Sequence, residues 1–215
     1  IPCAITYRYV EDPTESLLAT MSELEASIFW RPKTKLPLEQ RIYDFAEVLL
    51  IVKELEYLKK SQSGRLPERI AALREHILSA VESRNQLQAA EKKVPERVKA
   101  ARKTIMEQLQ QENLEEVQRQ KLEDDMEDLF LVIQSFSYPG DYVVDHPTTD
   151  RMAETIDKFE EDVLRKTTAT IKAERRVKVH FGEPVEVSSD RKVKSQSSTI
   201  TSTIEQRVQE MLSSH

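Results

Sequence analysis

Glycine, cysteine and aromatic residues are scarce in this chain of 215 residues. Only three glycines are present, Phe, Tyr and Trp together make up 6% of the sequence, and Cys3 is the single cysteine. So few glycines argue against an all-β fold and against a glycine-looped nucleotide site, because both rely on glycine in tight turns. One cysteine excludes an internal disulfide and a cysteine-based zinc site, which suits a reducing, cytosolic setting.

Long apolar runs are also missing. The longest, Val48–Val52 and Leu129–Ile133, are far shorter than the roughly 20 residues that a membrane span requires. The net charge of -6 provides no general attraction to nucleic acid or to anionic lipid. We therefore expect no transmembrane segment in this chain and no nucleic-acid partner.

The sequence is rich in charged residues, and its apolar residues follow a helical period. Asp, Glu, Lys and Arg make up 33% of the residues, and apolar residues recur at spacings of three and four through most of the chain. This spacing predicts a mostly helical chain. The expected helices carry apolar stripes that begin at Leu17, Ile42, Leu66, Val94, Leu122, Met152 and Ile200. In the helix from Leu38 to about Lys60 the apolar arc broadens around Val48–Val52, so we expect that helix to be buried on most sides there.

Three of the expected helices begin alike. The shared segments are Leu36-Pro37 before Glu39-Gln40-Arg41-Ile42, Leu66-Pro67-Glu68-Arg69-Ile70, and Val94-Pro95-Glu96-Arg97-Val98. Proline suits the first helical turn, an acidic side chain favours the positive helix end, and the preceding hydrophobe can pack against the new helix. The likeness is compatible with a tandem repeat, but the segments differ after the first turn, so we favour common capping chemistry.

Two segments far apart in the sequence have the alternation of β-strands. Val177, Val179 and Phe181 alternate with polar residues, Gly182-Glu183-Pro184 interrupts the pattern, and Val185-Glu186-Val187 resumes it. Cys3 to Tyr9 reads as a second, buried strand. Two strands alone do not make a stable sheet. We therefore expect two or three strands of an incomplete sheet, which the chain leaves to build helices and then rejoins.

Residues that could carry chemistry do not form a recognisable catalytic pattern. His76 lies in a helical register, His146 lies in a turn that leads into a helix cap, and His180 lies on the polar side of a strand. The carboxylates from Glu112 to Asp128 fall on an outward helix face without the Glu-x-x-His motif of bundle metal sites. Cys3 reads as a small core residue. We expect no catalytic residue, no metal and no cofactor in this chain.

The strand segments and the last helix stand in a suggestive order. Ile1-Pro2-Cys3-Ala4-Ile5-x-Tyr7 is a short apolar strand centred on a proline, and Val177-x-Val179-x-Phe181-Gly182-Glu183-Pro184-Val185 is an apolar alternation that ends in Gly-Glu-Pro. A helix from Thr199 to Leu212 follows. In this order the segments resemble the last signature block, a later strand and the terminal helix of the glycerolipid acyltransferases, the 1-acyl-sn-glycerol-3-phosphate acyltransferase family.

The resemblance implies an α/β parent fold and a division of the chain into three parts. Residues 1–60 would end the acyltransferase core with a strand and helices, residues 61–170 would form a helical insertion, and residues 171–215 would supply the returning strand, a polar loop and the terminal helix. Three further segments look similar to a bacterial subgroup with a long helical insertion: Trp30-Arg31-Pro32, Leu36-Pro37 and Arg41-Ile42-Tyr43.

The activity that the resemblance implies is fatty acyl transfer in phospholipid biosynthesis. The donor would be acyl-CoA or acyl-carrier protein, and the acceptor would be a hydroxyl of a lysophospholipid or of glycerol phosphate. Such a protein would be cytoplasmic and peripheral to the membrane, with a lipid substrate and the membrane surface as partners. The helical insertion would serve as a lid or as a binding site for a protein partner.

The catalytic motif of that family is not found in this sequence. The family uses His-x-x-x-x-Asp, in which the histidine is the general base and the aspartate orients it. Five residues after His76, His146 and His180 stand, in that order, Val81, Arg151 and Val185. The family's phosphate-binding block is not found either. Both blocks precede the proline strand in the family, so we expect a C-terminal fragment that is inactive by itself.

One residue alone can be carried over from the family blocks, and two rival function classes stay open. Pro2 belongs to the proline strand, where its role is structural or substrate-adjacent. The alternative is a non-enzymatic α-helical module that binds a protein partner through its acidic helices. A degenerate acyltransferase-like domain with a scaffolding role is a third possibility.

Overall fold

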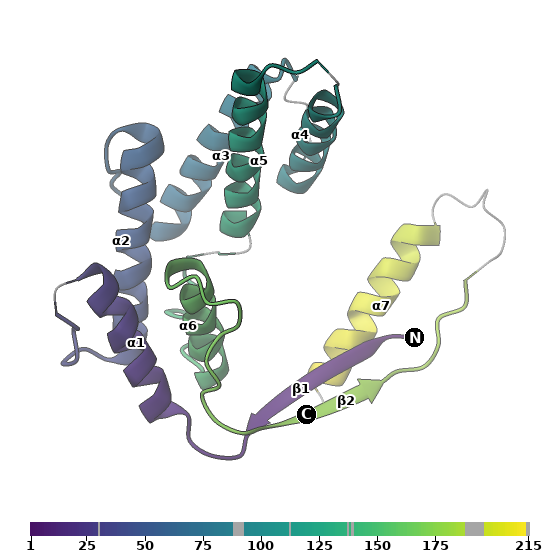
Figure 1. Ribbon diagram of the computed structural model, residues 1–215. Helices are drawn as coiled ribbons and strands as arrows, with labels where there is room; N and C mark the ends of the chain where they lie inside the picture. Colours follow the sequence, from purple (N-terminus) through teal and green to yellow (C-terminus); the bar gives the residue numbers. More distant parts are fainter. Residues whose placement is uncertain are drawn as a thin grey trace. The chain divides into compact units, whose positions relative to one another are not determined.

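The computed structural model describes residues 1–29, 31–87, 93–111, 113–136, 138, 140–187 and 196–213. Trp30, which belongs to one of the resembling segments, and residues 188–195 of the expected polar loop lie outside this part. The described elements, in chain order, are β1 (Cys3–Tyr9), α1 (Thr14–Ile28), α2 (Leu38–Leu58), α3 (Leu66–Arg84), α4 (Val94–Leu109), α5 (Glu116–Phe136), α6 (Thr149–Val163), β2 (Arg175–Phe181) and α7 (Gln196–Ser213) (Figure 1). The prediction of a mostly helical chain with a small sheet is confirmed.

The chain divides into two compact units. The strand unit contains Ile1–Ala19 and Ala169–His215, and the helical unit contains Thr20–Thr168. The expected boundaries after residues 60 and 170 group α2 with the first strand. In the structure α2 lies in the helical unit. The correspondence of either unit to part of an acyltransferase stays a prediction.

The strand unit is built on one antiparallel pair of strands. Register runs from Cys3 opposite Phe181 to Tyr9 opposite Arg175. Two further backbone bonds extend the pairing, from Gly182 N to the Pro2 carbonyl (3.0 Å) and from Val10 N to the Glu174 carbonyl (2.9 Å). Helix α7 packs on β1 (Figure 1). The return of the chain to its first strand is therefore confirmed.

The apolar face of this strand pair is exposed, which contradicts the expected burial. Opposite residues of an antiparallel pair point to the same face, so one face carries Cys3, Ile5, Tyr7, Val177, Val179 and Phe181. The exposed fractions are 46% for Ile5, 55% for Tyr7 and 74% for Phe181. The prediction of a buried strand is thus wrong, and so is that of Cys3 as a core residue, because Cys3 is exposed. The reason is that a two-stranded ribbon has two faces, and α7 packs on the one that holds buried Ala4.

The helical unit has a continuous apolar core contributed mainly by α3, α4 and α5. These helices pack side by side, while α2 contacts α3 and α6 (Figure 1). Each core position falls on a predicted apolar stripe or beside one. The buried core residues are Leu50, Leu66, Leu73, Ile77, Leu78, Val81, Val98, Ala101, Ile105, Leu122, Leu129 and Val132.

An arginine in each of the three similar helix starts makes the same contact. Arg41, Arg69 and Arg97 follow one another at intervals of 28 residues. They pair, in order, with Glu25 (2.9 Å), Glu54 (2.8 Å) and Glu82 (2.7 Å) on the preceding helix. All three carboxylates are buried.

The three helix starts therefore share a tertiary contact in addition to capping chemistry. Capping is present as predicted, since proline occupies the first turn of α3 and of α4, and Glu96 accepts a hydrogen bond from the Lys93 backbone N–H (3.3 Å). The arginine that follows the cap anchors each new helix to the one before it. Breaking a buried ion pair of this kind by removing one partner typically costs about 3–5 kcal/mol.

Candidate functional site

Pro2 lies where the three family-like segments meet. It is buried, and its carbonyl accepts the hydrogen bond from Gly182 N described above. Arg207 of α7 donates from Nη1 to the carbonyls of Glu183 (2.7 Å) and Pro184 (3.2 Å). The proline strand, the Gly-Glu-Pro segment and the last helix are thus held together in one small unit.

Gly182 suits this junction because its neighbours leave little room for a side chain. A Cβ added there would lie 3.3 Å from the sulfur and methyl carbon of Met211 and 3.5 Å from the Pro2 Cβ. The Pro2 ring offers no group that exchanges protons or binds a metal. Its contacts in this unit are packing beside Gly182 and one backbone hydrogen bond, which are structural.

None of the three described histidines shows a catalytic arrangement. His76 is exposed on α3. His146 is also exposed, and its Nδ1 contacts the Asp145 carbonyl. His180 is half-buried in the strand pair, with Nε2 3.1 Å from the Thr6 hydroxyl. These positions agree with the structural roles that the sequence predicts.

The loop before α6 forms a helix cap, as the sequence predicts. The Thr148 hydroxyl accepts a hydrogen bond from the Arg151 backbone N–H (3.3 Å) and caps the helix start. The Arg151 side chain in turn donates to the Tyr142 carbonyl (2.9 Å) and stacks over the Tyr142 ring. These contacts tie the start of α6 to the loop that precedes it.

The acidic face of α5 is only partly solvated, which corrects the expectation of an outward, fully exposed surface. Asp125 is buried and accepts hydrogen bonds from Arg84 (2.7 Å) and Asn85 (2.6 Å) at the end of α3. Asp128 accepts from Arg84 and from the Tyr57 hydroxyl, both at 2.7 Å. Burial, and then the bond to the Asp128 carboxylate, raise the pKa of Tyr57 well above its usual range.

Asp125 and Asp128 join α5 to α2 and to the end of α3 through these hydrogen bonds. Within the described ranges, no three His, Cys, Asp or Glu side chains lie close enough to one another to hold a metal ion. Glu112, at the start of the predicted acidic segment, lies outside those ranges.

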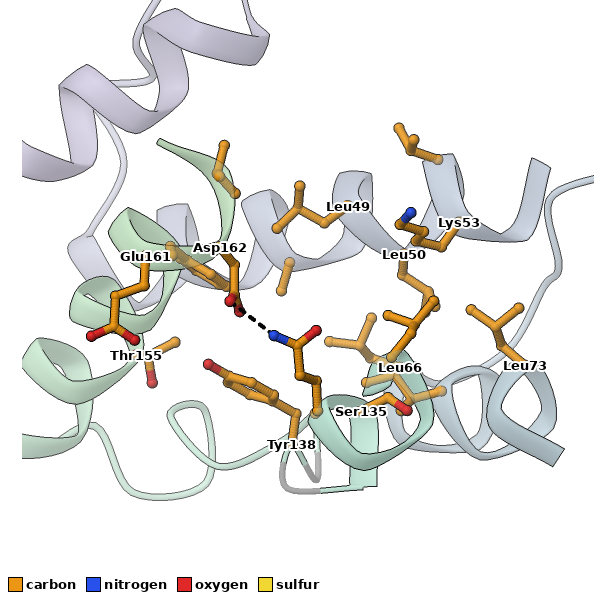
Figure 2. A pocket seen from close by; sticks show the side chains of 18 of the residues that line it. Leu49, Leu50, Lys53, Leu66, Leu73, Ser135, Tyr138, Thr155, Glu161 and Asp162 are labelled. Carbon is orange, nitrogen blue, oxygen red and sulfur yellow. Dashed lines mark hydrogen bonds between the residues drawn. The ribbon is translucent and has the colours of Figure 1, made fainter. Parts of the chain in front are cut away.

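The described part of the helical unit contains a groove of about 940 Å³ between α2, α5, α6 and the loop before α6, with Leu66, Ile70 and Leu73 of α3 also in its lining. Figure 2 shows Leu49, Leu50 and Lys53 of α2 on one side, with Glu161 and Asp162 of α6 on another. The dashed bond in Figure 2 joins the Gln134 amide of α5 to Asp162 (3.0 Å). Side chains from segments far apart in the sequence thus surround one space.

Apolar side chains that line this groove remain exposed. The exposed fractions are 51% for Val52, 62% for Phe130 and 50% for Val144. The sequence predicts that α2 is buried on most sides around Val48–Val52, and this is wrong for Val52. The broad apolar arc of α2 in the sequence indicated an apolar surface at this place. An apolar arc does not show whether protein or solvent covers that surface.

The rim of this groove is acidic. Six carboxylates line it, against the two cations Lys53 and Arg165: Glu56, Asp124, Glu127, Asp128, Glu161 and Asp162. Tyr138 lies among them, and its pKa is raised first by burial and then by the negative charges of Asp162, Glu154 and Glu161. The Tyr138 phenol therefore remains protonated at neutral pH.

No helix in the described part is long and apolar enough to span a membrane. No protein-family profile matches the sequence, and neither the curated proteins nor the solved structures contain a match.

Proposed function

We propose that this chain is the C-terminal part of a glycerolipid acyltransferase with an α/β parent fold. The strand unit would complete a sheet whose other strands lie in the rest of that protein. The parent would transfer a fatty acyl group from acyl-CoA or acyl-carrier protein to a lysophospholipid or glycerol-phosphate hydroxyl. It would act as a peripheral protein at the cytoplasmic surface of a membrane.

The observation that carries this proposal is the exposed apolar face of the β1–β2 pair. Six neighbouring side chains, from Cys3 to Phe181, form that face. An isolated two-stranded ribbon is marginally stable in water, and a continuous exposed apolar patch is typical of a surface that another element covers. Further strands and helices of a larger α/β domain would bury this face and pair the free strand edges.

The meeting of the family-like segments also supports the proposal. The resemblance rests on Pro2, on Gly182-Glu183-Pro184 and on the last helix, which stand far apart in the sequence. In the strand unit these three are joined by the Gly182–Pro2 backbone bond and by the two bonds from Arg207. A chance likeness of short motifs would not require them to be neighbours.

The chain by itself would not catalyse acyl transfer. None of its histidines begins a His-x-x-x-x-Asp motif, so the base and its orienting carboxylate would have to come from the parent's upstream sequence. Pro2 would order the sheet beside that site and would take no part in the chemistry.

The coding sequence upstream of Ile1 provides the sharpest test. It should encode a His-x-x-x-x-Asp block, and the complete protein should acylate lysophosphatidate with acyl-CoA or acyl-carrier protein as donor. Alanine in place of that histidine should abolish turnover, and the isolated chain should show none. A start codon at Ile1, an unrelated upstream sequence, or turnover by the isolated chain would refute the proposal.

The second candidate is a protein-interaction module formed by the helical unit, and the groove between α2, α5 and α6 favours it. In an acyltransferase parent the same unit would serve as a lid or as a partner-binding bundle. Deletion of Leu66 to Asp162 from the complete protein should then alter activity or lipid association. Unchanged values of both would exclude a lid.

A further inference from the structure

We propose that the groove between α2, α5 and α6 binds an amphipathic helix that carries lysine and arginine beside its apolar face. This inference names a partner for the second candidate function. It rests on the helical unit alone and does not depend on the acyltransferase assignment.

The floor of the groove has the character of a helix-binding surface. Leu49 and Leu50 of α2 point into it (Figure 2), and the exposed side chains of Val52, Phe130 and Val144 continue it toward solvent. Amphipathic helices bind such grooves by inserting apolar residues at positions i, i+3, i+4 and i+7. An open apolar groove that is already formed avoids the cost of ordering the receptor on binding.

The rim determines which kind of helix fits. Asp124, Glu127 and Glu161 are exposed at the groove. The Lys53 charge is already paired with Glu56 (2.7 Å), and Lys158 of α6 pairs with Asp162 (2.8 Å) and Glu161 (3.7 Å). Arg84 pairs with Asp128 (2.7 Å). With Arg165 included, four cations face the six carboxylates of the rim. The rim therefore carries a net negative charge, which attracts a cationic ligand and accelerates its association.

The same charge argues against other occupants of the groove. The carboxylate of a fatty acid, the phosphates of acyl-CoA and an anionic membrane surface would each meet carboxylates of like sign. The net charge of -6 on a second copy of this chain also opposes its association at long range. A cationic amphipathic helix satisfies both the apolar floor and the acidic rim.

A designed peptide tests the proposal on the full chain. The probe is a labelled peptide of about 18 residues, with leucine at i, i+3, i+4 and i+7 and lysine or arginine on either side of that stripe. A matched peptide has glutamate at every lysine and arginine position. Fluorescence anisotropy should show binding of the basic peptide that weakens as salt is added, and at least about tenfold weaker binding of the acidic one.

Variants locate the binding surface. Phe130→Ser should weaken binding of the basic peptide about tenfold, because it removes an exposed apolar anchor from the groove. Glu127→Lys should weaken binding about threefold and reduce its salt dependence. The matched controls are Val117→Ser and Glu123→Lys, which change exposed residues of the same helix outside the groove and should leave the affinity unchanged.

Several results would overturn the proposal. These are no binding of the basic peptide, equal binding of the acidic peptide, and equal effects of the groove variants and their controls. Displacement of the peptide by palmitate or by anionic vesicles would assign the groove to lipid, and loss of binding through self-association would assign it to a second copy. Each of these results would leave the acyltransferase proposal untouched, since that proposal rests on the strand unit.

Discussion

Replacement of Arg69 by methionine tests the energetic role of the arginine bridges. Arg69 donates from Nε and Nη2 to the two oxygens of Glu54 (2.9 and 2.8 Å) and from Nη1 to Glu47 (2.9 Å). Methionine keeps much of the apolar stem but removes the charge and all three donors. The buried Glu54 carboxylate would then keep only the hydrogen bond from the Gln62 backbone N–H (2.9 Å).

The expected loss of stability is about 3–5 kcal/mol, the usual result of leaving one ion of a buried pair without its partner. The Glu47 bond contributes little to this sum, because Glu47 is 43% exposed and surface ion pairs are worth about 0–1 kcal/mol. For a unit of this size, such a loss lowers the unfolding temperature by about 10 °C.

The assay is chemical and thermal unfolding followed by far-ultraviolet circular dichroism, which reports mainly on the helices. The control is Lys53→Met, which removes an exposed pair with Glu56 and should change stability by less than about 0.5 kcal/mol. The double variant Arg69→Met/Glu54→Leu removes both charges, so it should recover most of the loss, apart from about 1 kcal/mol for the freed Gln62 N–H.

Two results would refute this reasoning. An Arg69→Met variant as stable as the Lys53→Met control would mean that the bridge contributes nothing. A double variant as unstable as the single one would mean that lost packing, and not an unpaired carboxylate, causes the destabilisation.

Three further predictions follow from the same contacts. The bonds from Arg69 and Arg97 lower the pKa of Glu54 and of Glu75. Stability from these groups is present above their ordinary pKa of 4.5 and is lost as the pH falls through the lowered values, so the free energy of unfolding should decrease as the pH falls below about 4.5. Gly182→Val should destabilise the strand unit by about 1–3 kcal/mol through overpacking against Met211, and Gly182→Ala should cost less. Hydrogen exchange of the β1 amides measures both losses. Cys3 should react with a thiol reagent as fast in the folded isolated chain as in the unfolded chain. In an acyltransferase parent that covers this face, the reaction should be slower. Slow labelling of the isolated chain would contradict the exposure of the strand face.

The helices were predictable because their apolar stripes are regular and local. The stripes that begin at Leu66 and Val94 place each helix start within the first turn that is observed. Proline at those starts provided a second, independent signal. Both patterns depend only on residues a few positions apart, so they can be recognised without knowledge of the fold.

The burial of charged residues was not predictable in the same way. Asp125 reads as a surface residue because its sequence neighbours are acidic, yet it is buried by Arg84 and Asn85, which lie some 40 positions away. The arginine bridges carried a weak signal, since Glu54 and Glu82 each stand 15 residues before their arginine. That signal becomes visible only once two helices are known to pack as neighbours.

The exposure of the strand face was unpredictable for a different reason. Alternation in Val177, Val179 and Phe181 shows which side chains share a face, and it contains no information on what covers that face. The groove could not be predicted for the same reason. The sequence shows that α2 has a broad apolar arc, but it does not show that solvent and not protein covers part of that arc. Sequence periodicity predicts that a surface is apolar more reliably than it predicts the partner of that surface.

The pairing of β1 with β2 also constrains the order in which the chain can fold. The Thr6–His180 contact joins residues 174 positions apart. Closing a flexible loop of that length costs about 4–5 kcal/mol of chain entropy, which a two-stranded ribbon cannot supply. Helical contacts are local and form rapidly. The strands should therefore join only after the intervening helices have folded and shortened the free chain, so that the residues of β1 are among the last in this chain to reach their native partners.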